Sequence, residues 1–144
     1  MIDLLFIITP HAMLLDIAGP AEAFRLANLH LARRGLPPRF RLRFAGPMPS
    51  ASSSVGLVLA GLEPLPMRLR SPTWVILAGQ PSARVSQVTP TIAACAQWLN
   101  KTLHRPLLAL DAAHRLITIC SGTLLAARAG LLGSMTVNPP SGEL

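Results

Sequence analysis

The stretch that decides the fold runs Leu116-Ile117-Thr118-Ile119-Cys120-Ser121-Gly122-Thr123-Leu124-Leu125-Ala126-Ala127-Arg128-Ala129-Gly130. Its first four residues are apolar or β-branched, which predicts a buried strand. A helix of small residues follows without an intervening loop and ends at Gly130, a residue suited to a left-handed C-terminal cap. Such an abrupt change from strand to helix strains the turn residue and lifts its side chain above the edge of the sheet.

Cys120 occupies this turn, and two interpretations of it are open. If the amides of the first helical turn surround the thiol, the positive end of the helix lowers its pKa from the free value of about 8.5 and produces a nucleophile. The alternative is a cysteine buried at the end of a strand, since free cysteine is among the most buried residue types.

The composition indicates one α/β-type domain without a membrane span or signal peptide. The chain has 144 residues, 51% of them hydrophobic, and a mean hydropathy of +0.47, which suits a sheet covered on both faces. No apolar run reaches the ~18 residues of a membrane helix, and Asp3 interrupts the N-terminal apolar stretch. Two cysteines, Cys95 and Cys120, are too few for a disulfide framework, so we expect a cytoplasmic protein.

The charge is strongly basic, with a net charge of +7 and a pI of about 11.5. Lys101 is the single lysine, and the richness in Arg, Ala, Leu and Pro is explained by coding composition as readily as by a polyanionic partner. Aromatic residues make up 4%, which offers no stacking platform for nucleic acid. We therefore expect no direct binding of nucleic acid and none of membranes. The densest basic cluster is interpreted as a solvated strand face rather than a phosphate site; it comprises Arg33, Arg34, Arg39, Arg41 and Arg43.

Strand and helix patterns alternate along the chain. We expect strands at 2–8, 39–44, 55–59, 74–78 and 116–119, helices at 20–34, 90–103 and 122–130, a loop at 47–54, and a helix break at Pro106. The first helix is expected to begin close to Pro20. This order predicts an α/β fold with a doubly wound, mostly parallel sheet and helices on both faces. In such sheets, sites form beyond the carboxyl ends of the strands.

Three segments place polar chemistry at that edge of the predicted sheet. Asp16 follows the first strand, Gly79 follows the strand at 74–78, and Cys120-Ser121-Gly122 forms the turn. A carboxyl group near a thiol can hold a proton and tune the sulfur, and a glycine lets backbone approach a developing oxyanion. No ligand pair has helical or Cys-x-x-Cys spacing, so we expect no metal.

Three segments carry a family resemblance: 15–24 (LDIAGPAEAF), 75–79 (VILAG) and 119–132, which begins ICSG and ends AGLL. They resemble the PfpI-like superfamily, which has the class I glutamine-amidotransferase-like fold. Within it the closest likeness is to the N-terminal sensor domain of GlxA-type, AraC-family transcriptional regulators. The resemblance covers Ile2 to about Leu132 and implies a flavodoxin-like sandwich that is usually dimeric.

The resemblance also implies roles for individual residues. Cys120 corresponds to the residue of the nucleophile elbow, with Asp16 as its carboxyl partner, while Gly79 and Ser121 supply amides to a ligand pocket next to Gly122. It implies no cofactor. Enzymes of the superfamily are cysteine hydrolases, glyoxalase-like or deglycase-like enzymes, or isocyanide hydratases. The regulators use the same fold to sense a ligand or to dimerise ahead of a helix-turn-helix domain.

The chain departs from the family pattern after Leu132. The family continues with a threonine-histidine segment, further strands and a helix, whereas residues 133–144 form a divergent tail and no histidine follows Cys120. We therefore expect an incomplete domain at 1–132, truncated and without the helix-turn-helix domain. Of the four histidines, His30 and His104 are interpreted as solvated, and His11 lies in the loop after the first strand, from which it could reach the pocket; the fourth is His114.

Three functional hypotheses follow. The first is a truncated sensing and dimerisation domain of a regulator, with a small-molecule ligand and no catalysis of its own. The second is a small cysteine-dependent enzyme, best exemplified by isocyanide hydration, in which Cys120 attacks an electrophilic carbon and Asp16 manages the proton. The third is a generic doubly wound domain whose cysteine is incidental.

Overall fold

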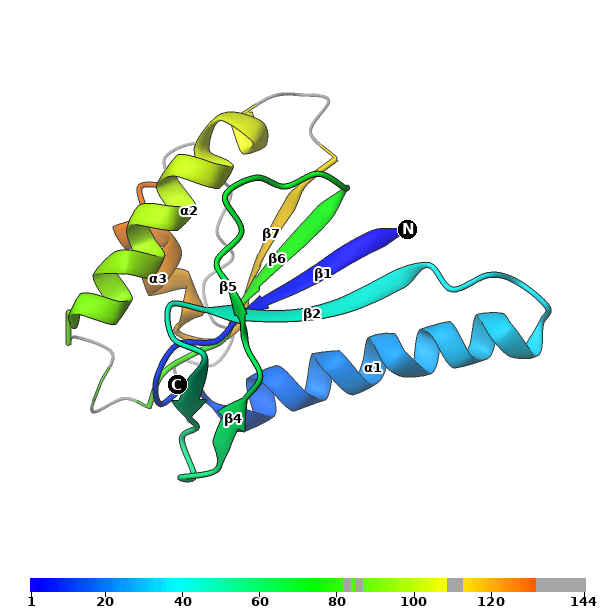
Figure 1. Ribbon diagram of the computed structural model, residues 1–144, viewed down its shortest axis with the longest axis horizontal. Coiled ribbons are helices and arrows are strands. Elements are labelled where there is room, and N and C mark those ends of the chain that lie inside the picture. Colours follow the sequence, from blue (N-terminus) through cyan, green and yellow to red (C-terminus); the bar gives the residue numbers. More distant parts are fainter. Residues whose placement is uncertain (82–83, 85–86, 109–112, 132–144) are drawn as a thin grey trace, which may run out of the picture.

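A parallel sheet with helices on both faces forms the body of the computed structural model, which describes residues 1–81, 84, 87–108 and 113–131 (Figure 1). The expected tail at 133–144 and most of the segment before the last strand, 109–112, lie outside the described residues. The strands are β1 (Ile2–Ile7), β2 (Phe40–Gly46), β3 (Ser50–Ser52), β4 (Val58–Ala60), β5 (Glu63–Pro64), β6 (Thr73–Leu77) and β7 (Arg115–Thr118). The helices are α1 (Leu14–Arg33), α2 (Pro90–Leu108) and α3 (Gly122–Arg128).

The strand order of the sheet is β5-β2-β1-β6-β7, and every pairing in it is parallel. The chain leaves β1 in one direction to form β2 and returns to the other side of β1 to form β6 and β7. This reversal confirms the predicted doubly wound α/β architecture, which is flavodoxin-like. It also brings the carboxyl ends of β1, β6 and β7 together, the edge at which sites form in such folds.

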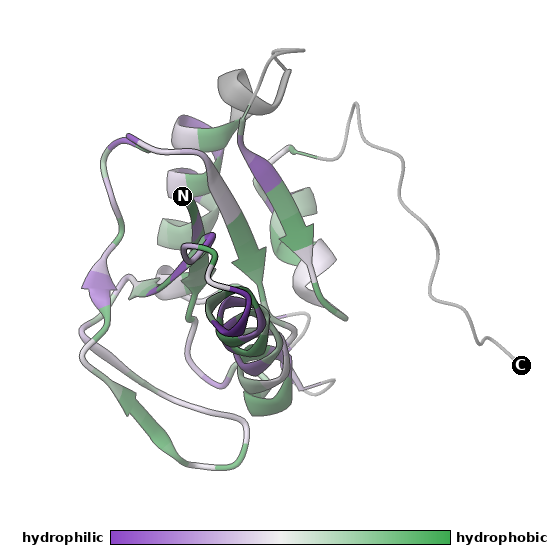
Figure 2. Ribbon diagram, turned by 90° about the vertical axis from the view of Figure 1, so that its right-hand side faces the viewer, coloured by the Kyte–Doolittle hydropathy of each residue, from purple (hydrophilic) through white to green (hydrophobic). Residues whose placement is uncertain are grey.

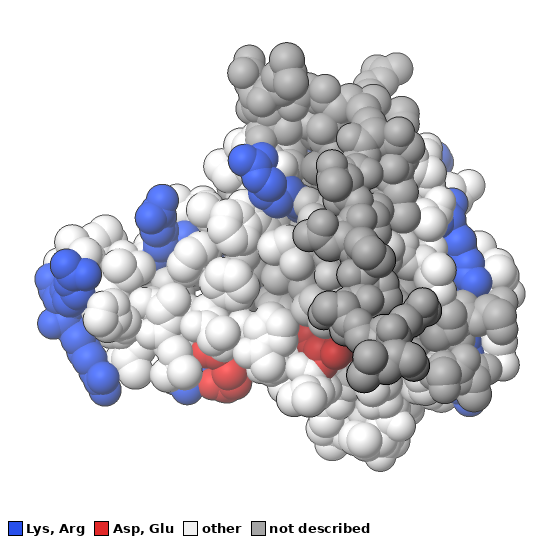
Figure 3. Space-filling model, turned by 180° about the vertical axis from the view of Figure 1, so that it is seen from behind, with Lys and Arg blue, Asp and Glu red and all other residues white. Residues whose placement is uncertain are grey.

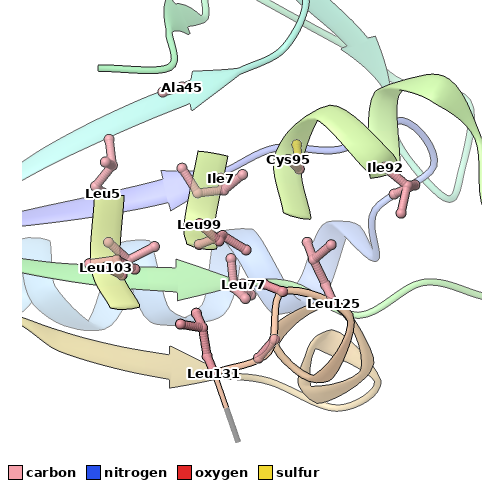
Figure 4. Close-up of a cluster of buried hydrophobic side chains, with 13 residues drawn as sticks. Leu5, Ile7, Ala45, Leu77, Ile92, Cys95, Leu99, Leu103, Leu125 and Leu131 are labelled. Carbon is pink, nitrogen blue, oxygen red and sulfur yellow. The ribbon is translucent and has the colours of Figure 1, made fainter. Parts of the chain in front are cut away.

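Alternate residues of β1 build two separate cores. Leu5 and Ile7 face α2 and α3, where Leu99 and Leu103 of α2 pack against them (Figure 4). Leu4, Phe6 and Ile8 belong to the core on the α1 side. Because β1 is buried on both faces, its sequence is almost continuously apolar, which is why it was recognisable as a central strand.

Cys95 lies on the inner face of α2 with none of its surface exposed, as its spacing predicted. Burial in this apolar environment raises the pKa of its thiol to about 12. Cys95 is therefore a packing residue of the core between the sheet and helices α2 and α3.

The helix ends follow the sequence signals closely. Gly130, with φ of 74°, ends α3: its N–H donates to the carbonyl of Ala127, and that of Leu131 donates to the carbonyl of Ala126. These two bonds define a Schellman cap and confirm the predicted end of the helix. At the start of α2, Thr89 Oγ1 accepts the N–H of Ile92 at 3.2 Å, the expected N-terminal cap.

Two helix boundaries were predicted wrongly. α1 begins at Leu14, not near Pro20, so Pro20 lies inside the helix and Asp16 lies in its first turn. The turn before the proline is held by tertiary contacts, since Leu14 N–H donates to Ser54 Oγ and Ile17 is buried. α2 likewise continues past Pro106 to Leu108, where a break was expected.

The short strand or hairpin arm expected at 55–59 is observed as β4, but its partner strand was missed. Residues 47–54 were expected to be a loop, but β3 lies within them and pairs antiparallel with β4. Its Ala51 and Leu59 pack on the core at the α1 side, and Ser52 accepts the N–H of His11 at 2.7 Å. The hairpin therefore fixes the loop that connects β1 to α1.

The sequence had suggested that the arginines of β2 are solvated, but Arg41 and Arg43 bind carboxylates. The carboxylate of Asp3, 3% exposed, accepts hydrogen bonds from Arg41 at 2.7 and 2.8 Å and from Arg43 at 3.1 Å. Arg43 also binds Glu63 at 2.7 Å. Burial acts to raise the pKa of Asp3, but the hydrogen bonds and charges of the two arginines outweigh it and hold that pKa below its ordinary value.

Hydrophobic residues concentrate in the strands and on the helix sides that face them, whereas α1, seen end-on in Figure 2, mixes hydrophobic and hydrophilic residues. Three leucines of α1 are exposed, Leu15 by 76%, Leu26 by 52% and Leu29 by 40%. Among the described residues, no helix combines the length and apolar character needed to cross a membrane.

Replacing the buried carboxylate tests the ion-pair cluster. We expect Asp3→Asn to lower the free energy of unfolding at neutral pH by about 2 kcal/mol, because two arginines lose their anionic acceptor. The folded-state pKa of Asp3 lies below its ordinary value of 3.8, so this stabilisation is complete above that value and is lost as the pH falls through the folded-state pKa. Urea unfolding followed by circular dichroism at a series of pH values measures the difference.

The matched control is Glu22→Gln, which removes an exposed ion pair with Arg25. Its effect should stay within about 0.5 kcal/mol at every pH. A gap between wild type and Asp3→Asn that persists unchanged at the acid end of the series contradicts the assigned role of the carboxylate.

Candidate functional site

Cys120 lies in a sharp turn between β7 and α3. Its φ is 52°, in the left-handed region that residues other than glycine rarely adopt, and it is exposed. Ile119 N–H still donates to the carbonyl of Leu77 on β6, and Gly122 N–H donates to the carbonyl of Ile119, so the strand ladder and the helix are separated by a single tight turn. Backbone strain of this kind persists only where the surroundings hold it in place.

Gly122 makes this turn possible because α3 starts directly against the end of β6. A Cβ at residue 122 would lie 2.4 Å from the carbonyl oxygen of Leu77 and 3.1 Å from that of Ala78. Both contacts are with backbone, which cannot move aside. The role that the structure gives Gly122 is therefore one of close approach.

Gly79 is the point at which the expected site residues meet. A Cβ at this position would lie 2.9 Å from Asp16 Oδ2, 3.0 Å from Cys120 Cβ and 3.0 Å from Ser121 Oγ. The carboxyl group, the cysteine and the serine thus surround one small volume, although they come from two separate segments of the chain and Gly79 lies on a third. The juxtaposition expected from the sequence is present.

The hydrogen bonds of the site differ from the expected ones. The N–H of Gly79 donates to Asp16 Oδ2 at 2.9 Å, and the carbonyl of Gly79 accepts the N–H of Met13 at 2.9 Å. Ser121 Oγ accepts the N–H of Gln80 at 2.8 Å and donates to its carbonyl at 3.1 Å. The Gly79 amide, expected to serve a ligand, is occupied by Asp16, and these bonds fasten α1 and the turn to the end of β6.

A pocket of about 120 Å³ opens beside the turn, between the end of β1, the end of β6 and the first turns of α2 and α3. Polar groups on its wall include Thr9 and Gln80, which are joined by a hydrogen bond of 2.6 Å from Nε2 to Oγ1. Ile92 and Leu125 supply apolar wall. Ser121 and Gly122 line it, whereas Cys120, Asp16 and Gly79 do not.

The histidines are distributed as follows. His11, with φ of 64°, lines the pocket, as its place after the first strand had suggested. His30 is exposed on α1, and His114 Nδ1 accepts the N–H of Thr73 at 3.1 Å at the amino end of β6. The side chain of His104 is outside what the structure describes. The described residues contain no group of three or more His, Cys, Asp or Glu that is close enough to bind a metal ion.

Most residues of the pocket wall were not predicted from the sequence. Thr9 and Gln80 directly follow β1 and the Ala78-Gly79 segment, so their place at the carboxyl edge of the sheet was a usable signal. Thr91, Ile92 and Leu125 carry no such signal, because only the packing of α2 and α3 brings their first turns to the pocket.

Filling the space at Gly79 tests this convergence. Gly79→Ala places a Cβ within 3.0 Å of three atoms and should lower the free energy of unfolding by about 1–3 kcal/mol. Gly19→Ala in α1 is the matched control: its added Cβ meets nothing within 4 Å, and it should raise stability by about 0.5–1 kcal/mol. Thermal and urea unfolding measure both changes, and equal stability of the two variants would contradict the close approach at Gly79.

The two cysteines should differ sharply toward a thiol reagent. Cys120 is exposed, whereas Cys95 is fully buried with a pKa near 12. In the folded protein at pH 7 we expect one thiol per chain to be alkylated by iodoacetamide, and peptide mass spectrometry should find it at Cys120. The Cys120→Ala variant should react only when urea unfolds it, and alkylation of that folded variant would show the assignment to be wrong.

The fold, but not the sequence, has recognisable relatives. No family model matches the sequence, and no curated protein matches it. A THiJ/PfpI family protein from Pseudomonas syringae superposes with a TM-score of 0.54 at 18% identity, over 90% of this chain and 46% of that one. Drosophila melanogaster DJ-1beta gives 0.54 at 14% identity, with 90% of this chain and 61% of that one. Schizosaccharomyces pombe DJ-1 gives 0.54 at 13%, with 91% and 64%.

These likenesses establish the fold. The chain spans between 46% and 64% of the length of the three structures. Between 90% and 91% of this chain is covered by the three superpositions. The chain therefore has the α/β fold that the THiJ/PfpI and DJ-1 proteins share.

Proposed function

We propose that this chain binds a small polar molecule in the pocket beside Ser121, as the ligand-sensing and dimerisation domain of a GlxA-like, AraC-type transcriptional regulator. The observation that carries the binding role is the pocket itself: it lies at the carboxyl edge of the sheet, and Ser121 and Gly122 line it while Cys120 does not. The identification with regulators rests on the resemblance of residues 16–28 and on the lack of a histidine after Cys120 in this sequence.

The pocket wall indicates the kind of ligand. About 120 Å³ is below the ~300 Å³ at which pockets for drug-sized ligands begin, so a compact metabolite fits best. Hydroxyl and amide groups of Thr9, Gln80 and Thr91 offer both donors and acceptors, and Ile92 and Leu125 provide an apolar side. A small molecule with one polar and one apolar end is the expected ligand class.

The contacts of the site also suggest how ligand binding in the pocket could change the position of α1 at the surface. Gln80 lines the pocket, while its neighbour Gly79 holds both Met13 and Asp16 at the start of α1. A ligand that moves Gln80 would therefore shift the anchor of α1. The outer side of α1 exposes Leu26 and Leu29, which suits the dimer that the resemblance implies.

The alternative is a cysteine-dependent enzyme, and one observation favours it. Cys120 is exposed in a strained backbone conformation, with Asp16 Oδ2 and Cys120 Cβ 2.9 and 3.0 Å from the same point. Strained residues of this kind cluster at functional sites. In an isocyanide hydratase-like reaction, the Cys120 sulfur would attack the isocyanide carbon while Asp16 transfers the proton, which requires the carboxyl group to leave the Gly79 amide.

A screen with three proteins separates the two functions. Thermal shift with a panel of small alcohols, amides and carboxylic acids should find compounds that stabilise wild type and Cys120→Ala equally, because Cys120 does not line the pocket. Leu124→Trp should abolish these shifts, since Leu124 lines the pocket and is 42% exposed, so a larger ring there fits without disturbing the core. Sedimentation of the same samples reports dimerisation.

Turnover is the opposing outcome. Wild type is incubated with an aryl isocyanide and with methylglyoxal, and loss of each compound is followed. Consumption by wild type that Cys120→Ala lacks would establish the enzyme and overturn the sensor assignment. Stabilising compounds that Leu124→Trp still binds would remove the pocket from the proposal.

A further inference from the structure

A second hollow lies at the opposite end of the sheet from Cys120. It has a volume of about 540 Å³ and is formed by the amino-terminal parts of β1 and β2 together with β5 and the segment that leads to β6. Its charged walls are Asp3, Arg41, Arg43, Glu63, Arg68 and Arg70. We call these six residues the arginine cleft.

Two of the arginines are held rigidly by the carboxylates. Arg41 donates hydrogen bonds to Asp3 from Nε and Nη2. Arg43 donates to Asp3 from Nη1 and to Glu63 from Nε and Nη2. Asp3 is fixed in turn because it belongs to the central strand and is 3% exposed. The guanidinium planes of Arg41 and Arg43 therefore require little further ordering when a ligand arrives.

The other two arginines have no such partner. Arg68 and Arg70 are exposed on the segment between β5 and β6, and within the described part of the chain no carboxylate pairs with either of them. Trp98 of α2 ties this segment down, because its Nε1–H donates to the carbonyl of Pro66 at 2.6 Å. Arg68 and Arg70 thus project from anchored backbone into the same hollow as Arg41.

The charges of the arginine cleft do not balance. Four guanidinium groups face two carboxylates, which leaves a surplus of two positive charges in one concave site. A phosphomonoester carries close to two negative charges at neutral pH, and arginine binds its oxygens in a bidentate manner. We propose that the arginine cleft binds the phosphate group of a small phosphomonoester, with Arg68 and Arg70 as its principal ligands.

The shape of the site favours a small ligand over nucleic acid. The positive charge lies in a hollow, whereas a nucleic-acid backbone is followed by an extended basic stripe. In the view from behind, the visible basic side chains of the described residues lie in separate groups rather than in one stripe (Figure 3). The site does not depend on the function proposed for the pocket at Ser121, because the two share no residue.

Calorimetric titration of the full chain tests the arginine cleft. The probes are inorganic phosphate and glycerol 3-phosphate, with glycerol and sodium chloride at matched ionic strength as blanks. Both phosphates should bind with one site per chain, and Arg68→Ala/Arg70→Ala should weaken them about tenfold or more, because the two arginines contribute charge-assisted bonds. Both side chains are exposed and lack a carboxylate partner among the described residues, so the variant should fold as wild type does.

The matched control is Arg33→Ala/Arg34→Ala, which removes the same charge from exposed positions at the end of α1. It should weaken binding by about twofold or less, since distant charges are screened. Equal losses in the two variants would show general attraction by a basic surface and overturn the proposal, as would the absence of a phosphate isotherm. A DNA duplex that binds while both phosphates do not would replace it with a nucleic-acid surface.

Binding of inorganic phosphate but not of glycerol 3-phosphate would restrict the ligand to the free anion and overturn the phosphomonoester assignment. If glycerol 3-phosphate binds at least as well, the group esterified to the phosphate is accommodated in the remaining volume of the arginine cleft. Either result is read from the wild-type chain alone.

Discussion

The close approach of backbone at Gly79 is the constraint on which the rest of the site depends. The end of β6, the first turn of α1 and the turn at Cys120 converge there, and a single methyl group would lie only 2.9–3.0 Å from atoms of Asp16, Cys120 and Ser121. Because the N–H and the carbonyl of Gly79 bind Asp16 and Met13, the same residue that admits these segments also joins them. The residues on either side of Gly79, Ala78 and Gln80, line the pocket beside Ser121, so the junction adjoins the pocket.

The two ends of the central strand β1 contribute to two different sites. Its carboxyl end leads to the pocket, whereas its amino end carries Asp3, the buried anion that organises Arg41 and Arg43. Asp3 shares the side of the sheet that Leu5 and Ile7 occupy, so the alternation that builds the core also aims the carboxylate at the arginines. A polar residue in a central strand is tolerated here because each carboxylate oxygen finds a guanidinium partner.

How much the sequence could predict depended on whether local or distant contacts set each feature. β1, β6 and the turn at Cys120 were predicted because continuous apolar runs and an absent loop are local signals, and so were the caps at Thr89 and Gly130. The start of α1 was missed because contacts from distant segments hold the turn before Pro20. The arginines of β2 were interpreted as solvated because their partners, Asp3 and Glu63, are about 40 and 20 positions away. The occupied amide of Gly79 could not be foreseen for the same reason.

The choice between a sensor and an enzyme for this fold depends on whether the Asp16 carboxyl group stays hydrogen-bonded to the Gly79 N–H. The convergence at Gly79 brings Asp16 beside Cys120, yet it also engages Oδ2 of Asp16 with a backbone N–H. Catalysis would therefore require the Asp16–Gly79 bond to break and α1 to lose one of its anchors, whereas ligand binding beside Ser121 requires neither. Ligand binding thus keeps a hydrogen bond that catalysis would have to break, and this difference is the physical reason to prefer binding over turnover. The strained turn at Cys120 is compatible with both.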